Sequence, residues 1–244
     1  PVRLYISAPG GADAEITAVS LGGELGAAMD VSKNVIDRAR RDIGLLAVGL
    51  TETFNTQHKA GDTLNQVAGS EFFTSITPVA TASPLNSGTT AVSAVIDDAT
   101  QMTGASYQID YTDSVVTITN LLTNATQEIN GTTVSIDGLT FTVSPFSNLT
   151  DGDRFLVEPT GRAASSMAVA ITDTSDIAAA NSGGNVGDNR NMLSLIALRE
   201  TNNLKDGTKS VYDIYNSAVS QVAVDTRSAR ANADTEVSLL QSVT

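Results

Sequence analysis

The sequence has no cysteine and no tryptophan, a single histidine, and only 5% aromatic residues among its 244 positions. Without cysteine, the chain can form no disulfide and perform no thiol chemistry. Ligand pockets are usually lined by large apolar and aromatic side chains, so their scarcity argues against a deep pocket. A lone histidine, His58, provides neither a pair of metal ligands nor a nucleophile–base pair. We therefore expect no catalytic residue, no cofactor and no metal site.

Basic residues are also scarce. The chain has 14 Lys and Arg residues against 27 Asp and Glu residues, which gives a net charge of −13. Such a surface repels phosphate backbones and anionic lipids. No stretch approaches the ~20 continuous apolar residues of a membrane span, and the richest one, residues 43–50, contains Gly44 and Gly49. We expect no nucleic-acid partner and no membrane insertion.

A long helical pattern is present instead. Between Glu24 and Gln57 there is no proline, and apolar positions recur at alternating steps of three and four. This spacing is typical of the seam of a coiled coil or a long helix bundle. The predicted seam consists of Leu25, Met29, Ser32, Ile36, Ala39, Ile43, Leu46, Leu50 and Phe54. A helix of ~50 Å is too long to be buried along its whole seam by a compact domain, so other long helices should pack alongside it.

A second long helix is predicted to begin near Ser210 and to run to the end of the chain. Ser210 and Asp213 resemble a capping box, which marks a helix start. Its predicted seam consists of Val211, Tyr215, Ala218, Val222, Thr226, Ala229, Ala233, Val237 and Leu240. A shorter helical pattern precedes it at residues 192–198, after a Gly- and Asn-rich stretch, 181–191, that is expected to be a mobile loop.

The end of the first helix carries the candidate site residues. His58 lies in its last turn and is expected to act as a helix-end cation or hydrogen-bond donor. Gly61 would then be the left-handed residue that stops the helix. Phe54, Asn55 and Gln57 leave two alternatives open, contact with a neighbouring subunit or packing at the helix end within the chain.

Short strands are predicted on both sides of this helix. Residues 3–6 and 14–20 are candidate strands around a Pro9-Gly10-Gly11 turn. Residues 74–90 have the composition of a linker, and the segment to about Pro159 alternates like antiparallel strands. Its predicted strands are 91–96, 107–111, 114–119, 134–136, 139–143 and 154–157. Asp137-Gly138 predicts a tight hairpin.

The predicted fold class is α+β, with a long-helix, coiled-coil-like bundle domain and an inserted antiparallel β-rich domain. We place the bundle domain at residues 1–80 and 161–244 and the β-rich domain at residues 81–160. Asp151-Gly152-Asp153 indicates a turn before the last strand rather than a calcium loop, which needs more oxygen ligands at regular spacing.

Several motifs resemble those of a known family. The first helix starts Gly22-Gly23-Glu24-Leu25-Gly26 and ends Phe54-Asn55-Thr56-Gln57-His58-Lys59-Ala60-Gly61, and further matches lie at 152–160 and 212–215. At this spacing the chain resembles, over most of its length, the bacterial flagellar hook-associated proteins of the hook–filament junction. The resemblance implies a central fragment that lacks the family's helical regions at both ends.

What the resemblance implies about function is mechanical. It implies a structural subunit of the bacterial flagellum that joins hook to filament and is exported through the flagellar export apparatus to an extracellular position. The implied partners are other copies in a ring, the hook protein and a second junction protein on the filament side. An export chaperone would bind a C-terminal region that is absent here.

Two other functions compete with this one. A secreted adhesin would show an exposed aromatic or apolar patch on the β-rich domain, and Tyr107 and Tyr111 are expected on one strand face. A hydrolase would need a close carboxylate pair or a base of raised pKa. The acidic residues are instead spread along helix faces and turns, so we expect no enzyme.

Overall fold

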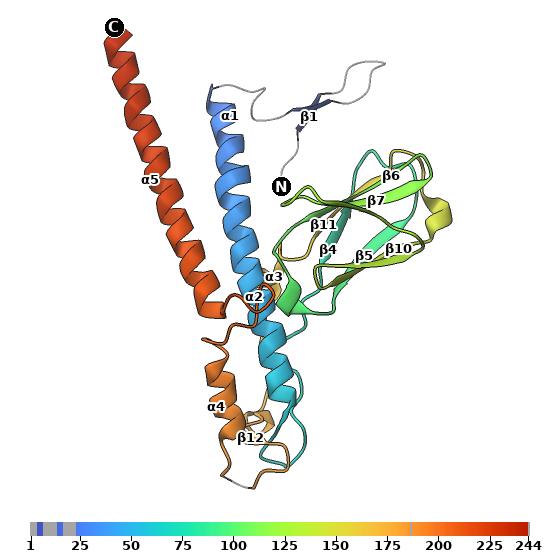
Figure 1. The fold of residues 1–244 in the computed structure, drawn as a ribbon, viewed down its shortest axis with the longest axis vertical. Helices are drawn as coiled ribbons and strands as arrows, with labels where there is room; N and C mark the ends of the chain where they lie inside the picture. The colour runs from blue at the N-terminus through green and yellow to red at the C-terminus, as the bar shows by residue number, and fades with distance from the viewer. Residues whose placement is uncertain (1–3, 7–13, 17–22, 186, 244) are drawn as a thin grey trace. The chain divides into compact units, whose positions relative to one another are not determined.

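The computed structural model describes residues 4–6, 14–16, 23–185 and 187–243. The chain divides into two compact units by its internal contacts (Figure 1). Unit 1 comprises residues 1–40 and 216–244, and unit 2 comprises residues 41–215. The fold class is mixed α+β, with long helices and antiparallel sheets, as predicted.

Unit 1 contains an antiparallel strand pair and parts of two long helices. Strand β1 (Leu4–Ile6) pairs with β2 (Ala14–Ile16); the predicted turn at residues 9–11 lies outside the described residues. Helix α1 (Gly23–Asp30) continues through a π-helical turn (Val31–Ile36) into α2 (Asp37–Lys59), and α5 spans Val211–Val243. The Arg38 guanidinium lies 3.9 Å from the Asp225 carboxylate. The long helices were predicted and the π-helical turn was not.

Unit 2 contains two antiparallel sheets, one ordered β5-β10-β9 and one ordered β4-β11-β6-β7-β8. Their strands are β4 (Val79–Ala82), β5 (Ala91–Ile96), β6 (Tyr107–Thr112), β7 (Val115–Asn120), β8 (Thr126–Glu128), β9 (Thr133–Ile136), β10 (Leu139–Ser144) and β11 (Arg154–Glu158). The six predicted strands are all present. Sequence reasoning missed β8, and it was wrong to treat residues 74–90 as a linker throughout, because β4 lies within them. The predicted domain limits at residues 80 and 160 stay a prediction.

The two sheets share a closed apolar core. Alternate residues of β6, β7, β10 and β11 are buried, and the Tyr107 and Phe141 rings pack edge to face with centroids 4.9 Å apart. The Tyr107 hydroxyl donates a hydrogen bond of 2.6 Å to Asp137. Asp137 and Gly138 have φ of 52° and 74°, which confirms the primed hairpin turn. Tyr107 is buried and Tyr111 packs on Phe146, so the aromatic patch that an adhesin would expose is not formed by these tyrosines.

The second half of α2 is the central helix of unit 2. Its buried positions include Leu45, Ala47 and Val48. Two glycines allow other segments to approach this helix closely. A Cβ at Gly44 would overlap the Thr160 carbonyl oxygen, and one at Gly49 would lie 2.5 Å from a Leu204 methyl carbon. The glycines that interrupt the apolar run thus admit the segment after β11 and the loop before α5.

Shorter elements complete unit 2. They are β3 (Gly61–Asp62), which pairs with β12 (Ala180–Asn181), and the helices α3 (Ala163–Ser166) and α4 (Arg190–Ala197). Before α5, residues 205–207 have positive φ, so the chain is not helical there. The predicted capping box is confirmed: Asp213 N–H donates to the Ser210 hydroxyl (3.0 Å), and Ser210 N–H donates to the Asp213 carboxylate (3.0 Å).

Candidate functional site

Asn55, in the last turns of α2, fastens a loop to the helix. Its side-chain oxygen accepts hydrogen bonds from the backbone N–H groups of Phe72 (3.0 Å) and Phe73 (2.9 Å). Its amide nitrogen donates to the Phe73 carbonyl (2.9 Å). The side chain is buried, and it supplies the backbone partners that a neighbouring strand would otherwise supply.

His58 fastens two further segments and is fully buried. The Ala178 N–H donates to Nε2 at 2.9 Å, and Nδ1 lies 2.7 Å from the Ser70 carbonyl oxygen. Because Nε2 accepts a hydrogen bond, the ring proton is assigned to Nδ1, which donates to Ser70. Both ring nitrogens are thereby satisfied. Of the two expected roles, a helix-end cation or a hydrogen-bond donor, the side chain has that of the donor, and the loop that folds back over the helix end removes it from water.

Gln57 and Asn191 extend this network to α4. Gln57 donates to the Asn191 side-chain oxygen (2.6 Å), and Asn191 donates to the Ala178 carbonyl (2.6 Å). Ala178 is thus held at its N–H by His58 and at its carbonyl by Asn191. We call Asn55, Gln57, His58 and Asn191 the helix-end clamp.

Gly61 does not have the predicted role of a left-handed helix stop. It belongs to β3 and is absent from the described residues with positive φ. A Cβ at this position would overlap the Asn191 amide nitrogen. Gly61 is therefore required by close packing against the clamp and not by the geometry of the helix end.

Phe54 lies beside the clamp, half-buried. Its ring packs against Phe72 at a centroid distance of 4.8 Å and against Phe73 at 5.3 Å. All contacts described for Asn55, Gln57 and His58 are made within the chain. Asn55 and His58 are buried by these contacts, whereas Gln57 and Phe54 are both half-buried, and contact of either with a neighbouring subunit stays a prediction.

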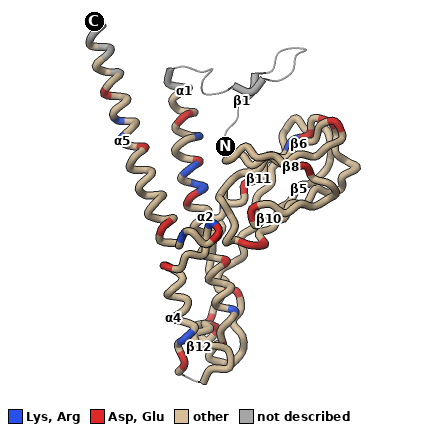
Figure 2. Tube along the Cα trace, in the orientation of Figure 1, with Lys and Arg blue, Asp and Glu red and all other residues tan. Residues whose placement is uncertain are grey.

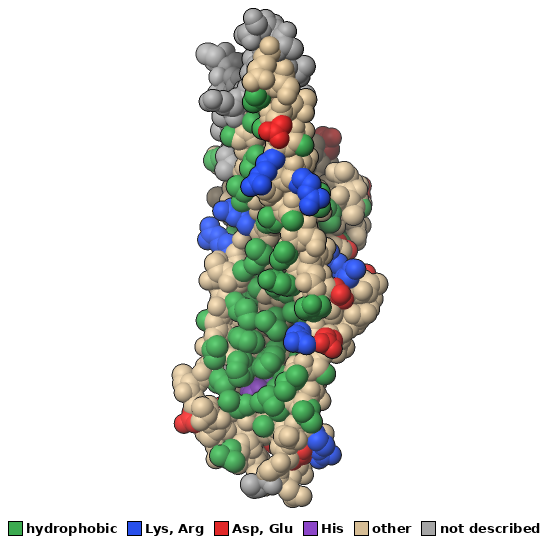
Figure 3. Space-filling view, turned by 90° about the vertical axis from the view of Figure 1, so that its left-hand side faces the viewer, with side chains coloured by type: hydrophobic (Ala, Val, Ile, Leu, Met, Phe, Trp, Pro, Cys, Tyr) green, Lys and Arg blue, Asp and Glu red, His purple; other side chains and the backbone are tan. Residues whose placement is uncertain are grey.

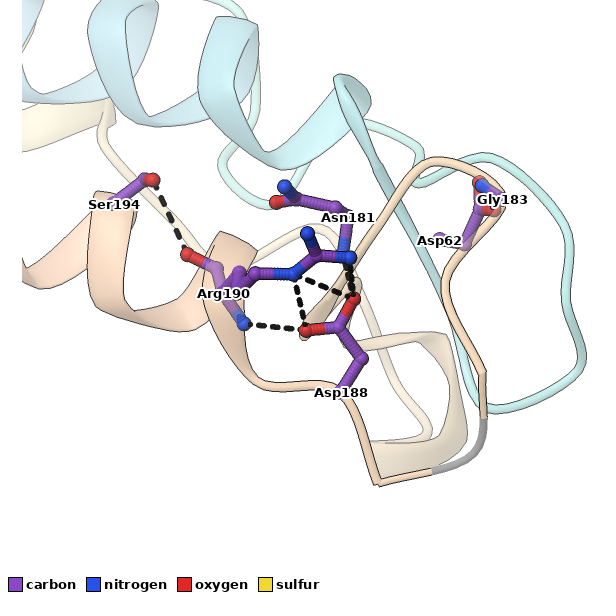
Figure 4. Close-up of polar contacts among 6 residues, drawn as sticks. All are labelled: Asp62, Asn181, Gly183, Asp188, Arg190 and Ser194. Atoms are coloured by element: carbon purple, nitrogen blue, oxygen red, sulfur yellow. Dashed lines mark hydrogen bonds and ion pairs between the residues drawn. The ribbon is translucent and has the colours of Figure 1, made fainter.

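The loop between β12 and α4, expected to be mobile, is tied down by two carboxylates (Figure 4). Asp188 accepts hydrogen bonds from the Arg190 side chain (2.8 Å to Nη2) and from the Arg190 and Asn181 N–H groups. The hydrogen bonds from Arg190 hold the pKa of the Asp188 carboxyl well below its usual range. Asp62 accepts from the Gly183 N–H at 2.6 Å. The loop therefore positions the start of α4, and with it Asn191.

The predicted seam of α5 is mostly exposed within this chain, whereas that of the first long helix is mostly half-buried. Among the described side chains, the exposed fractions lie between 42% and 54% for Ile36, Ile43, Tyr215, Val222 and Val237. Met29, Leu46, Leu50 and Val211 are half-buried, and the side chains of Leu25 and Leu240 lie outside the described residues. The fully buried positions of α2 include Leu45 and Val48, and the seam residue Leu46 packs against the same core. That other long helices pack along these seams stays a prediction.

Apolar side chains are also concentrated on one face of the molecule around His58 (Figure 3). The exposed apolar side chains of unit 2 include Ile43 on α2 and Leu193 and Ile196 on α4. Charges are distributed differently: Lys and Arg gather on the first long helix, and Asp and Glu gather at the turns of the β-sheets (Figure 2). An apolar helical surface of this kind is suited to protein–protein contact.

The described residues hold no group of three or more His, Asp or Glu side chains arranged for a metal ion. Among the helices in the same part of the chain, none is long and apolar enough to cross a membrane. The arrangement at the helix end can therefore hold loops together and present apolar surface.

Comparison with known families gives two matches in succession along the chain. Residues 1–73 match a model described as "Flagellar hook-associated protein FlgK helical domain". Residues 81–159 match one described as "Flagellar hook-associated protein 1, D2-like domain". Together they cover more than half of the chain.

Curated relatives carry the same name. The chain is 34% identical over 221 residues to flagellar hook-associated protein 1 of Escherichia coli (strain K12), a match that covers 88% of this chain and 40% of the relative. It is 29% identical over 231 residues to the Salmonella typhimurium protein of that name, covering 90% of this chain and 41% of the relative. The chain thus spans about two fifths of the length of these relatives.

A solved structure has the same fold. The flagellar hook junction protein FlgK from Burkholderia pseudomallei superposes with a TM-score of 0.85 at 20% identity, covering 98% of this chain and 65% of that one. The fold, the two successive domain matches and the named relatives agree, and this chain belongs to the flagellar hook-associated protein 1 family.

Proposed function

We propose that this chain is part of a structural subunit that joins the hook to the filament of the bacterial flagellum. Its relatives are named as hook-associated proteins, and the protein that shares its fold is named as a hook junction protein. The observation in the structure that best supports assembly is the set of exposed apolar side chains along the seams of the long helices. An apolar helix face in water is stabilised when another helix packs against it.

The partners we propose follow from this role. Other copies of the same protein would pack in a ring along the seams, between the hook protein and a second junction protein on the filament side. An export chaperone would bind outside this segment. The protein would act outside the cell as part of the flagellum, and it would perform no catalysis. The proposal of an adhesin is not favoured, because the tyrosines that suggested it lie in or against the core.

The experiment is complementation of a deletion of the encoding gene in the source bacterium. Deletion should give bare hooks by electron microscopy and flagellin shed into the medium, and the intact gene should restore filaments. Normal filaments in the deletion strain would refute the junction role. An adhesion defect with normal filaments would instead support the adhesin.

Complementation with a variant of the seam tests whether this surface is needed for assembly. Ile43→Asp places a charge on the exposed seam of α2, and Leu85→Asp places one at a similarly exposed apolar side chain of a loop in the β segment. We expect Ile43→Asp to reduce filament number strongly and Leu85→Asp to leave it unchanged. Equal behaviour of the two variants would show that the seam has no special part in assembly.

A further inference from the structure

The loop between β8 and β9 contains Asn130-Gly131, the one Asn-Gly pair in the sequence. Both residues are exposed. The chain is anchored on either side of them. The Ile129 N–H donates to the Val116 carbonyl (2.8 Å), and the Thr132 carbonyl accepts from the Val143 N–H (2.8 Å). Between these two hydrogen bonds, Asn130 and Gly131 form the short connection from one sheet to the other.

Nothing in the surroundings restrains this pair. Gly131 has a φ of 117°, and a Cβ added there would meet no atom within 4 Å. Within the described part of the chain, the Gly131 N–H and the Asn130 side chain have no hydrogen-bond partner. Glycine has no side chain beyond its hydrogen, so nothing on Gly131 hinders approach of its backbone nitrogen to Cγ of Asn130.

We propose that Asn130 is a site of spontaneous deamidation in the folded protein. The Gly131 nitrogen loses its proton and attacks Cγ of Asn130. An N–Cγ bond forms, the Cγ–Nδ2 bond breaks, and ammonia leaves with the proton, which gives a five-membered succinimide. Water then opens the ring at either carbonyl and leaves aspartate or isoaspartate. Water is the only co-reactant, and nothing is oxidised or reduced.

Other candidate residues of the same β segment are restrained. Asn148 donates through Nδ2 to the Thr89 hydroxyl (3.0 Å) and precedes leucine. Asn124 precedes alanine, whose Cβ hinders ring closure. Asp151 precedes Gly152, but the Gly152 N–H donates to the Tyr111 carbonyl (2.9 Å) and is held away from the carboxyl group. Asn130 thus differs from these residues in two ways: it is followed by glycine, and, among the residues that the structure describes, neither its side chain nor the next N–H group is held by a hydrogen bond.

The product would change the loop and leave the sheets in place. Each event adds one negative charge to a chain of net charge −13, and isoaspartate also adds one carbon to the main-chain path. The anchoring bonds of Ile129 and Val143 lie outside the altered bond. The modified fraction would therefore rise with the age of the protein without unfolding it.

The test is peptide mapping by mass spectrometry of the full chain after incubation at neutral and mildly alkaline pH, with fragmentation that separates aspartate from isoaspartate. We expect Asn130 to convert several-fold faster than Asn124 and Asn148, and faster at the higher pH. We expect a similar rate for Asn130 when the chain is unfolded in urea. Conversion no faster than at Asn124, or a rate that rises many-fold on unfolding, would overturn the proposal.

Two glycine variants complete the test. Gly131→Ala should slow conversion of Asn130 several-fold, because the new side chain hinders the attack. Gly152→Ala is the matched control, since Gly152 also has positive φ (92°) and open space around it. It should leave the rate at Asn130 unchanged. An unchanged rate in Gly131→Ala, with its substitution verified in the same peptide map, would also overturn the proposal.

Discussion

The β segment and the long helices handle their apolar side chains in opposite ways. In the β segment, Phe141, Val143 and Ile109 are at most 1% exposed, because two sheets cover one another. On the helices, Ile43 and Val222 remain 50% and 42% exposed. A pair of sheets can close a core within one chain, whereas the outward apolar stripe of a long helix stays in water until another element packs on it. The β segment therefore buries its apolar side chains within this chain, whereas the long helices keep an apolar face available for association.

The largest effect should come from emptying the β core. Phe141→Ala removes a fully buried ring that packs against Tyr107, and we expect a loss of about 3–5 kcal/mol in the free energy of unfolding. Val95→Ala, in the neighbouring strand and 57% exposed, is the control and should change it by less than about 0.5 kcal/mol. Urea unfolding measures both. If the two variants lost similar amounts of free energy of unfolding, the buried core between the sheets would not be what stabilises the β segment.

The second-largest loss of stability should come from the helix-end clamp. Asn55→Ala leaves the N–H groups of Phe72 and Phe73 buried without their partner, at a cost of about 1–3 kcal/mol. Asn34, exposed and bonded only to the Asp30 side chain of the same helix, is the control. Asn34→Ala should be nearly neutral in the same urea experiment. A neutral Asn55→Ala would mean that the loop at residues 70–73 does not depend on α2.

The elements that could be predicted from the sequence are those specified by a few residues close together in the chain. The Asp137-Gly138 hairpin needs only its two turn residues, and the capping box needs only Ser210 and Asp213, so both were predictable. The clamp was not, because its bonds join positions far apart in sequence: Gln57 meets Asn191, and His58 meets Ala178. The motif that contains Asn55 and His58 was visible, but a buried role depends on loops whose paths the sequence does not specify.

The buried face of α2 illustrates the same limit. A period of three and four identifies a seam, yet Leu46 is half-buried while its neighbour Leu45 is fully buried. The glycines at 44 and 49 decide this, because they admit Thr160 and Leu204 on that side of the helix. A one-dimensional pattern shows that a helix has an apolar face. It does not show which of two adjacent faces the rest of the chain covers.

The stability of the β segment should depend on pH through the carboxyl group of Asp153. Burial raises the pKa of the Asp153 carboxyl, but hydrogen bonds from the Thr150, Gly88 and Ser87 N–H groups outweigh it, so the pKa lies below its ordinary value. A lowered folded-state pKa stabilises the fold above the unfolded value of about 3.9, and this stability is lost as the pH falls. Urea midpoints between pH 6 and 3 should fall less steeply in Asp153→Asn than in the unmodified chain. Parallel curves would contradict this role.

A smaller effect is expected at the start of α5. Ser210→Ala removes the hydroxyl that accepts from the Asp213 N–H, and the loss should be about 1 kcal/mol. Helix content from circular dichroism and the thermal midpoint report it. Thr208→Ala provides a nearby control, because its hydroxyl donates to Lys205 outside the helix. A drop of the same size in Thr208→Ala would indicate that the whole loop, and not the cap, sets the stability of this helix.

The smallest effect in the isolated chain should be at the seam. Ile43→Ala should change the free energy of unfolding by less than about 0.5 kcal/mol, whereas Leu45→Ala, two positions away and buried, should cost about 2–5 kcal/mol. If the seam is an assembly surface, the order reverses when association is measured. Sedimentation of the full-length protein should show weaker self-association for Ile43→Ala than for the unmodified chain. A costly Ile43→Ala in the isolated chain would instead mean that the seam is covered by this chain itself, and the helices would no longer differ in kind from the sheets.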